Sequence, residues 1–248
     1  MKQRLSIILF ALGFFLISLV LTMPASQAYK WGLYPEEIQL YGLKGRVLDG
    51  NAKQVFINNL TVNNISWSWR PLSLLFGKLS FNWHVDSMDS QGDGIAAMNL
   101  LGNIELSDVT VRFNAHKADV LLPKGNHLLG NIQLDLEYAL FRDKLERIKA
   151  TAETEQLSVT TVVGDFKISP LNINVQGNET GDIQVKIIDS VDSQGMTLLA
   201  EVKNQEITLT GNINSQNAIA KQVSSLLPLI ANKQGNNWIV SWKGILPL

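Results

Sequence analysis

The chain has no cysteine among its 248 residues, so it contains neither disulfide bonds nor thiolate metal ligands. It also has little charge, because charged residues make up 17% of the sequence and the formal net charge is −1. Proteins that bind nucleic acid usually carry a strongly basic surface, so this balance argues against a nucleic-acid partner. About 220 residues can bury an adequate core without disulfides. The composition therefore suits an ordinary folded domain with polar turns.

Residue patterns that support catalysis are also missing. The histidines His84, His116 and His127 are scattered, and no His-Glu-x-x-His pair occurs. No Gly-x-Ser-x-Gly nucleophile elbow is present, and Gly77-Lys78 lacks the preceding glycine of a phosphate-binding loop. The sequence therefore predicts a protein that is not an enzyme and has no catalytic residues, cofactor or metal ion.

One acidic stretch bears a faint similarity to a calcium-binding loop. Asp86, Asp89 and Asp93 lie close together in sequence, with Gly92 and Gly94 between and beside them. The stretch lacks the full alternating ligand pattern and the closing glutamate of such loops. A solvated hairpin loop is the better interpretation.

The longest stretch without charge lies near the N-terminus. Lys2 and Arg4 precede the run from Leu5 to Met23, which contains no charged residue. At ~1.5 Å per residue, a helix of this length spans roughly 28 Å, close to the hydrocarbon core of a bilayer. The cations on its N-terminal side favour a cytoplasmic N-terminus. We therefore expect residues 1–4 in the cytoplasm, a transmembrane helix at 5–23, and a domain at 29–248 on the far side of the membrane.

A cleaved leader is the alternative interpretation of the same run. Pro24 ends the run, and Ser26-Gln27-Ala28 offers the small residues that signal peptidase needs. The run is longer than an ordinary signal-peptide apolar region of ~7–15 residues, which favours a retained anchor. Both interpretations place residues 29–248 in the same compartment.

Alternating apolar residues recur along the rest of the chain. Ile104 and Leu106 are followed by Val109, Val111 and Phe113, with a phase slip near Asp108 that predicts a β-bulge. Further predicted strands are 132–140, 157–163, 171–175, 183–188, 196–202 and 207–213. Short polar turns separate them, which predicts an antiparallel meander.

One segment near the C-terminus has helical periodicity instead. Between Gln216 and Ile230, apolar residues follow the 3, 4, 7 spacing of an amphipathic helix. Asn214 or Ser215 could cap its start, and Pro228 falls in its last turn. We expect this helix to cover one end of the sheet, with docking of a partner as the alternative.

The start of the predicted domain carries the most specific pattern. Val55–Leu60 and Ile65–Trp69 are expected to be strands, and Pro71 begins a short apolar turn before a third strand from Gly77 to Trp83. Trp67 and Trp69 would lie on one face of their strand, as core or groove lining or as a stacking surface for a ligand. The residues that form the pattern are Gly45, Gly50, Trp67, Pro71, Leu74, Leu75, Gly77 and Leu79, with Gly244-Ile245-Leu246-Pro247 at the end of the chain.

These residues resemble the type II secretion system protein N family of Gram-negative bacteria. The chain departs from the family pattern at Leu48, where the family more often has tryptophan. The resemblance implies an inner-membrane protein with one anchor, whose periplasmic part contacts the outer-membrane secretin and the inner-membrane platform proteins. It implies that Gly45, Gly50, Trp67, Pro71, Leu74, Leu75, Gly77 and Pro247 have structural or partner-contacting roles. It also implies a distant similarity to AsmA-like and TamB-like proteins.

The expected fold is therefore mainly β, a curved antiparallel sheet forming an AsmA-like groove or a sandwich, with a C-terminal amphipathic helix. The first functional hypothesis is a non-enzymatic component of the type II secretion apparatus. The alternative is a periplasmic lipid-binding or lipid-transfer protein whose sheet holds acyl chains, which would need a large open apolar surface. A third hypothesis is an exported β domain of unrelated role.

Overall fold

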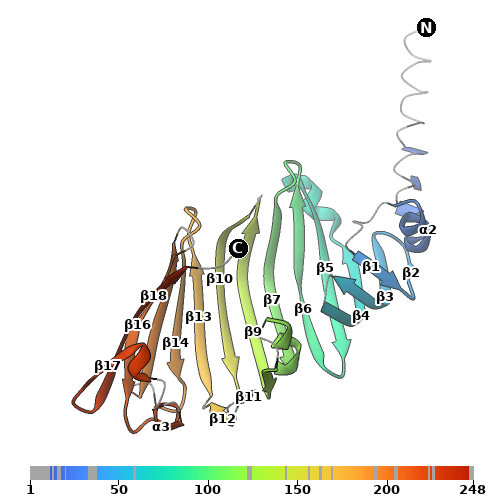
Figure 1. Cartoon of the computed structure of the whole chain (residues 1–248). Coiled ribbons are helices and arrows are strands. Elements are labelled where there is room, and N and C mark those ends of the chain that lie inside the picture. Colours follow the sequence, from blue (N-terminus) through green and yellow to red (C-terminus); the bar gives the residue numbers. More distant parts are fainter. Residues whose placement is uncertain are drawn as a thin grey trace. The chain divides into compact units, whose positions relative to one another are not determined.

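A computed structural model describes most of the chain (Figure 1). The residues it describes are 21–32, 38–57, 60–121, 125–142, 144–155, 157–161, 164–168, 170–192, 195–203, 206–222, 224 and 227–245, with Leu12, Phe14, Phe15, Ser18 and Leu19. Among them, fifteen strands belong to a large antiparallel sheet and three to a small one. The chain divides into two compact units, Met1–Met88 and Asp89–Leu248.

The first unit contains a short helix, five strands and a 3₁₀ helix. In chain order they are α2 (Ala25–Lys30), β1 (Ile38–Tyr41), β2 (Lys44–Gly45), β3 (Asp49–Ile57), β4 (Leu60–Trp69), η1 (Pro71–Phe76) and β5 (Lys78–Ser87). The strand order is β1-β3-β4-β5, and β2 pairs with β3. The strand expected at 55–60 is wrong at its end, because β3 stops at Ile57 and Leu60 already belongs to β4.

The second unit contains the remaining strands. They are β6 (Ser90–Asn99), β7 (Ile104–Asn114), β8 (His127–Leu129), β9 (Asn131–Phe141), β10 (Leu145–Thr154), β11 (Leu157–Thr161), β12 (Gly164–Ile168), β13 (Leu171–Gly177), β14 (Ile183–Asp189), β15 (Met196–Lys203), β16 (Glu206–Asn214), β17 (Ala231–Gln234) and β18 (Asn237–Ile245). Their order in the large sheet is β6-β7-β9-β10-β13-β14-β15-β16-β18-β17, and β12-β11-β8 form the small sheet. The predicted antiparallel meander is confirmed, apart from the three strands that leave it and the exchange of β17 and β18.

The predicted bulge near Asp108 is confirmed. Asp108 has φ +50°, and the register of β6 against β7 shifts by one residue between Asp93 and Ile95. A second register shift lies opposite Glu137, where β9 meets β10. Because the bulge at Asp108 adds one residue to β7, Leu106 and Val109 point to the same face of the sheet, and the apolar face continues through the phase slip.

The C-terminal helix is shorter than expected. Instead of one helix over 216–230, the structure has α3 (Ala218–Gln222) and a single 3₁₀ turn, η3 (Leu227–Leu229). Its cap is Asn217 rather than Asn214 or Ser215, because Asn217 Oδ1 accepts a hydrogen bond from the Ile219 amide at 2.9 Å. The short elements still cover the end of the sheet, since Ala220 and Leu227 are buried against Met196, Ile213, Ala231 and Val240.

The structure describes only scattered positions of the uncharged N-terminal run. Leu12, Phe14, Phe15, Ser18 and Leu19 are helical, as are Leu21 and Thr22 at its end. Within the described residues, no helix has both the length and the hydropathy needed to cross a membrane. Residues 1–4 and most of the run lie outside the described part, so the anchor and the leader both stay predictions.

Candidate functional site

The predicted residues Gly45, Gly50 and Trp67 come together at one end of the first unit. Gly45 has φ +80° in the tight turn between β2 and β3, a conformation that favours glycine. A Cβ atom on Gly50 would lie 2.8 Å from Cζ2 of Trp67 and 2.7 Å from the carbonyl oxygen of Arg46. The Trp67 indole therefore packs directly on the glycine backbone, and its Nε1 donates a hydrogen bond to Val47 O at 2.8 Å. These residues build the hairpin.

The predicted residues Pro71, Leu74, Leu75 and Gly77 form a separate feature, the helix η1. Pro71 occupies the first turn, where its missing N–H leaves no broken hydrogen bond, and Gly77 ends the helix at φ +68°. The Ser73 hydroxyl lies 2.7 Å from Arg70 O and 2.8 Å from Lys78 O, which holds the turn closed. Within η1, four apolar side chains are exposed: Leu72 (72%), Leu74 (53%), Leu75 (80%) and Phe76 (80%). Packing against the described residues does not explain them.

Trp67 and Trp69 share one face of β4, as predicted. The register pairs them with Trp83 and Phe81 of β5, so four half-buried aromatic side chains lie together on this face. The Trp69 Nε1 atom is buried, and it has no hydrogen-bond partner among the described residues. This aromatic face lines the sheet, and whether it stacks against a ligand stays a prediction.

The second unit presents one apolar face and one polar face. The register places Val109, Leu136 and Ala150 side by side on the apolar face, and continues to Val175 and Val185. Further residues of this face are Phe113, Ile132, Leu134, Ala152, Leu171, Ile173, Ile187, Leu198, Ala200, Leu209, Trp238, Val240 and Trp242. We call this set the apolar face.

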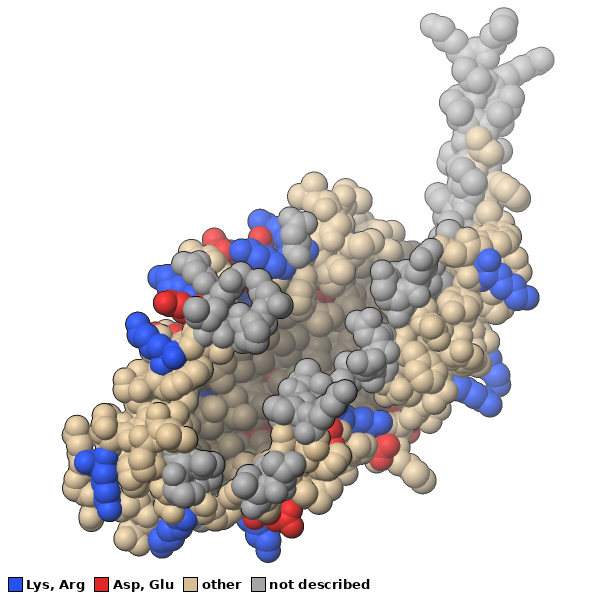
Figure 2. All heavy atoms as spheres, in the orientation of Figure 1, with Lys and Arg blue, Asp and Glu red and all other residues tan. Residues whose placement is uncertain are grey.

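The apolar face is covered unevenly. Over β15 to β18 it packs beneath α3 and η3. Over β13 and β14, side chains such as Ile173, Val175 and Val185 are only half-buried. Figure 2 shows the molecule hollowed over strands of the second unit, with mostly uncharged atoms inside and Lys, Arg, Asp and Glu near the margins. Among the described residues, the strands form one large sheet and one small sheet of three strands, and the expected choice between a groove and a sandwich stays a prediction.

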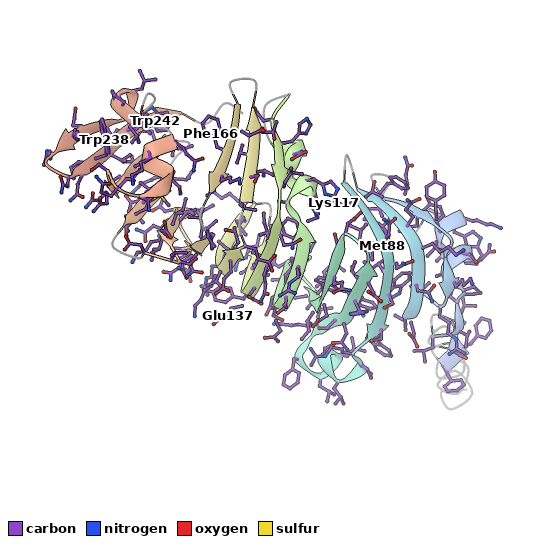
Figure 3. All side chains as sticks on the ribbon, turned by 90° about the horizontal axis from the view of Figure 1, so that it is seen from below. Met88, Lys117, Glu137, Phe166, Trp238 and Trp242 are labelled. Carbon is purple, nitrogen blue, oxygen red and sulfur yellow. The ribbon has the colours of Figure 1, made fainter. Side chains whose placement is uncertain are left out.

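The opposite face is polar, and its charges are paired. Glu137 contacts Lys149, which raises the pKa of the lysine through their hydrogen bond and charge attraction. Gln184 Nε2 donates to Glu201 at 2.8 Å, and Lys203 lies 3.8 Å from Asp182. An open depression of about 530 Å³ is lined by Lys149, Asp182, Gln184, Glu201 and Lys203 but not by Glu137. In Figure 3, Glu137 lies on the other side of the sheet from Trp238 and Trp242.

The acidic stretch forms no metal centre in the described part of the chain. Asp86 lies in β5 and Asp93 in β6, while Asp89 pairs with Lys117 at 3.7 Å. The described residues include no group of three His, Asp or Glu side chains that could hold an ion. The interpretation as a calcium loop therefore finds no support.

Sequence reasoning missed three polar contacts that position the covering elements. Asp119 accepts hydrogen bonds from the Leu128 amide at 2.7 Å and pairs with His127 at 2.9 Å, which lowers the pKa of this carboxyl. The buried Asp189 accepts from Asn217 Nδ2 at 2.8 Å. Gln222 bonds both the amide and the carbonyl of Lys167 at 2.7 Å. The contacts of Asp189 and Gln222 join residues 28 and 55 positions apart, whereas Asp119 bonds residues eight and nine positions away. Apolar alternation carries no signal for any of these polar contacts.

Pro247 lies outside the described residues, so its predicted role is untested by the structure. Gly244, in the same terminal pattern, lies in β18 against Trp242. The backbone carbonyl of Leu48 accepts a hydrogen bond from the Trp69 amide at 2.8 Å. The family tryptophan at that position is therefore not needed for this pairing.

Comparison with known proteins gives one match. Residues 36–240 match the sequence pattern of the family described as type II secretion system (T2SS), protein N. Neither the curated proteins nor the solved structures gave a match to this chain. The matched segment covers most of the chain and includes the hairpin, η1 and all of the apolar face except Trp242. The chain therefore belongs to the type II secretion system protein N family, which implies a role in type II secretion and interaction with other components of that apparatus.

Proposed function

We propose that this chain is a non-enzymatic accessory component of the type II secretion apparatus, tethered in the inner membrane by residues 5–23. The N-terminus is cytoplasmic and residues 29–248 are periplasmic. The protein acts through contacts with the secretin and the inner-membrane platform proteins during export of folded proteins across the outer membrane. The family match over residues 36–240 carries this proposal.

Two features of the chain support the tether and the contacts. The run Leu5–Met23 is uncharged and follows Lys2 and Arg4, which favours the orientation given. In the described part of the chain, β18 pairs with the shorter β17 from Asn237 to Val240, and the Ser241 amide donates to Ile230 O at 3.0 Å, so Trp242 to Ile245 extend beyond this pairing. An open strand edge can pair with a strand of a partner protein.

A deletion strain tests the proposed role. We expect enzymes that are normally secreted to accumulate in the periplasm, and the full-length chain to restore their export. A matched control replaces residues 1–28 with a cleaved leader, so that the same domain is periplasmic but untethered. Restoration by the full chain alone supports the tether, whereas restoration by both chains supports the secretion role without it. Unchanged export in the deletion strain contradicts the proposal.

A second candidate function is the binding of lipid acyl chains on the apolar face. The observation that favours it is that Ile173, Val175 and Val185 are only half-buried on the apolar face. Half-buried apolar side chains in a row offer the surface that a hydrocarbon chain needs. Phospholipid that co-purifies with the detergent-extracted protein, measured by mass spectrometry after exchange into lipid-free buffer, would support this function.

A further inference from the structure

The helix η1 presents apolar side chains to the exterior in a fixed conformation. None of its six residues is buried, and Leu75 and Phe76 are both 80% exposed. Pro71, the Ser73 hydroxyl and the left-handed Gly77 close the turn from within. A rigid exposed apolar cluster of this kind marks a contact surface, because a soluble surface rarely groups four large apolar side chains.

η1 emerges at the end of the first unit to which the uncharged N-terminal run is attached. The Val47 amide donates to Met23 O at 3.0 Å, and Pro24 forms an isolated β-bridge with Arg46. The Trp69 amide donates to Leu48 O at 2.8 Å, and η1 begins two residues later. The turn residues Arg46, Val47 and Leu48 thus connect the end of the run to Trp69, from which the chain continues into η1. The whole path is on the order of 20 Å long.

The same end of the unit carries exposed cations. Arg70 directly precedes η1, Lys44 begins β2, and Arg46 lies in the following turn, which contacts Met23 and Pro24. Lys30 ends α2 and is also exposed, while Asp49 is an exposed acidic side chain at the start of β3. Apolar side chains surrounded by lysine and arginine are the composition that binds at the interface of an anionic bilayer.

We infer that η1 is a second membrane contact, at which Leu72, Leu74, Leu75 and Phe76 enter the interfacial layer of the bilayer that holds the N-terminal run. Arg46 and Arg70 lie against anionic lipid headgroups beside them. The choice of a bilayer as occupant rests on the proposed tether, because a tethered unit keeps this end within reach of the membrane. With two contacts, the first unit has a fixed orientation on the membrane instead of swinging about a single linker.

The absence of cysteine makes a direct test available. Single cysteines replace Leu75 in η1, Leu12 in the N-terminal run, and Val191, an apolar residue of the second unit that is 77% exposed. Each full-length variant carries an environment-sensitive fluorophore and is reconstituted in vesicles of phosphatidylethanolamine and phosphatidylglycerol. Brominated phospholipids then quench a fluorophore that lies in the bilayer. We expect quenching at positions 12 and 75 to be several-fold stronger than at position 191.

The outcomes separate this inference from the proposed tether. Quenching at position 12 without quenching at position 75 overturns the membrane contact of η1 and leaves the tether in place. Quenching at position 75 without quenching at position 12 supports the contact and contradicts the tether. No quenching at either position overturns both. Protection of position 75 from aqueous iodide without lipid quenching assigns η1 to contact with a second copy of this chain, and also overturns the inference.

A change of lipid charge tests the part played by the cations. With phosphatidylcholine in place of phosphatidylglycerol, we expect quenching at position 75 to fall several-fold while quenching at position 12 is unchanged. The substitutions Arg46→Gln and Arg70→Gln should produce the same fall in the anionic vesicles. Quenching at position 75 that depends on neither change overturns the assignment of headgroup contacts to these arginines.

Discussion

Gly50 shows how a single residue fixes the geometry of the first unit. Its α-carbon lies beneath the Trp67 ring and between the carbonyl oxygens of Lys44 and Arg46. A side chain there must displace the ring and the turn together, although the backbone of Gly50 is not left-handed. The glycine is therefore required by close packing rather than by backbone conformation.

Replacing Gly50 with alanine is expected to destabilise the first unit by about 1–3 kcal/mol, because the new methyl group overpacks the site. Asn51→Ala is the matched control on the same strand, and this exposed residue should change stability by less than about 0.5 kcal/mol. Denaturant unfolding followed by tryptophan fluorescence measures both. Adding Trp67→Phe to Gly50→Ala should recover part of the loss, and equal midpoints for Gly50→Ala and Asn51→Ala would contradict the packing argument.

Asp119 is expected to make stability depend on pH in the acid range. Its folded pKa lies below the ordinary 3.8, because the Leu128 amide and His127 favour the carboxylate. The carboxylate therefore stabilises the fold above pH 3.8, and this contribution is lost as the pH falls through the folded pKa. In thermal unfolding between pH 2 and 6, the Asp119→Asn variant should show a smaller fall in melting temperature at acid pH than the unchanged protein. Asp165→Asn, an exposed aspartate of β12, serves as control, and identical profiles for the two variants would count against this role.

At the scale of elements, α3 depends on polar contacts because it is too short to be stable alone. Asn217 both caps it and bonds the buried Asp189, and Gln222 fastens its end to β12. Asn217→Ala should destabilise the second unit by about 1–3 kcal/mol, because it removes both the helix cap and the amide that donates to Oδ2 of the buried Asp189. Hydrogen exchange should become faster in α3 and at Lys167. Asn232→Ala in the exposed part of β17 is the control. Unchanged hydrogen exchange in α3 of the Asn217→Ala variant would contradict the role of Asn217 in holding this helix.

Local patterns predicted the strands well and the covering elements poorly. The alternation through Val111 and Leu136 is a property of neighbouring residues, and it even identified the bulge at Asp108. The helix expected over 216–230 failed because its apolar spacing comes from two short pieces that both face the sheet. The strands β8, β11 and β12 form a separate small sheet in which β11 pairs with β8, and alternation within a strand does not specify which strands pair.

The exposed state of η1 could not be read from sequence either. An apolar turn such as Pro71–Phe76 normally predicts burial, since large apolar side chains are usually inside. The position of this turn between β4 and β5, whose pairing ends at Trp69 and Phe81, is what distinguishes an exposed turn from a buried one. Only the structure shows that no described residue covers it.

At the scale of the molecule, a secretion component and a lipid carrier need different things from the apolar face. A scaffold needs only a folded sheet, whereas a lipid carrier needs the uncovered part of the face to stay apolar. Val185 and Lys186 are neighbours on β14 that point to opposite faces, so they form a matched pair. Substitutions at these two positions can therefore separate the functions without changing the strand.

Val185→Glu should abolish any lipid that co-purifies with the protein, because a charge on the apolar face excludes hydrocarbon. Lys186→Glu changes the charge more but faces solvent, and should leave bound lipid unchanged. In the deletion strain, export restored by both variants would show that secretion needs the sheet only as a scaffold. Export lost with Val185→Glu alone, in a variant whose denaturation midpoint matches that of Lys186→Glu, would instead join the apolar face to the secretion role.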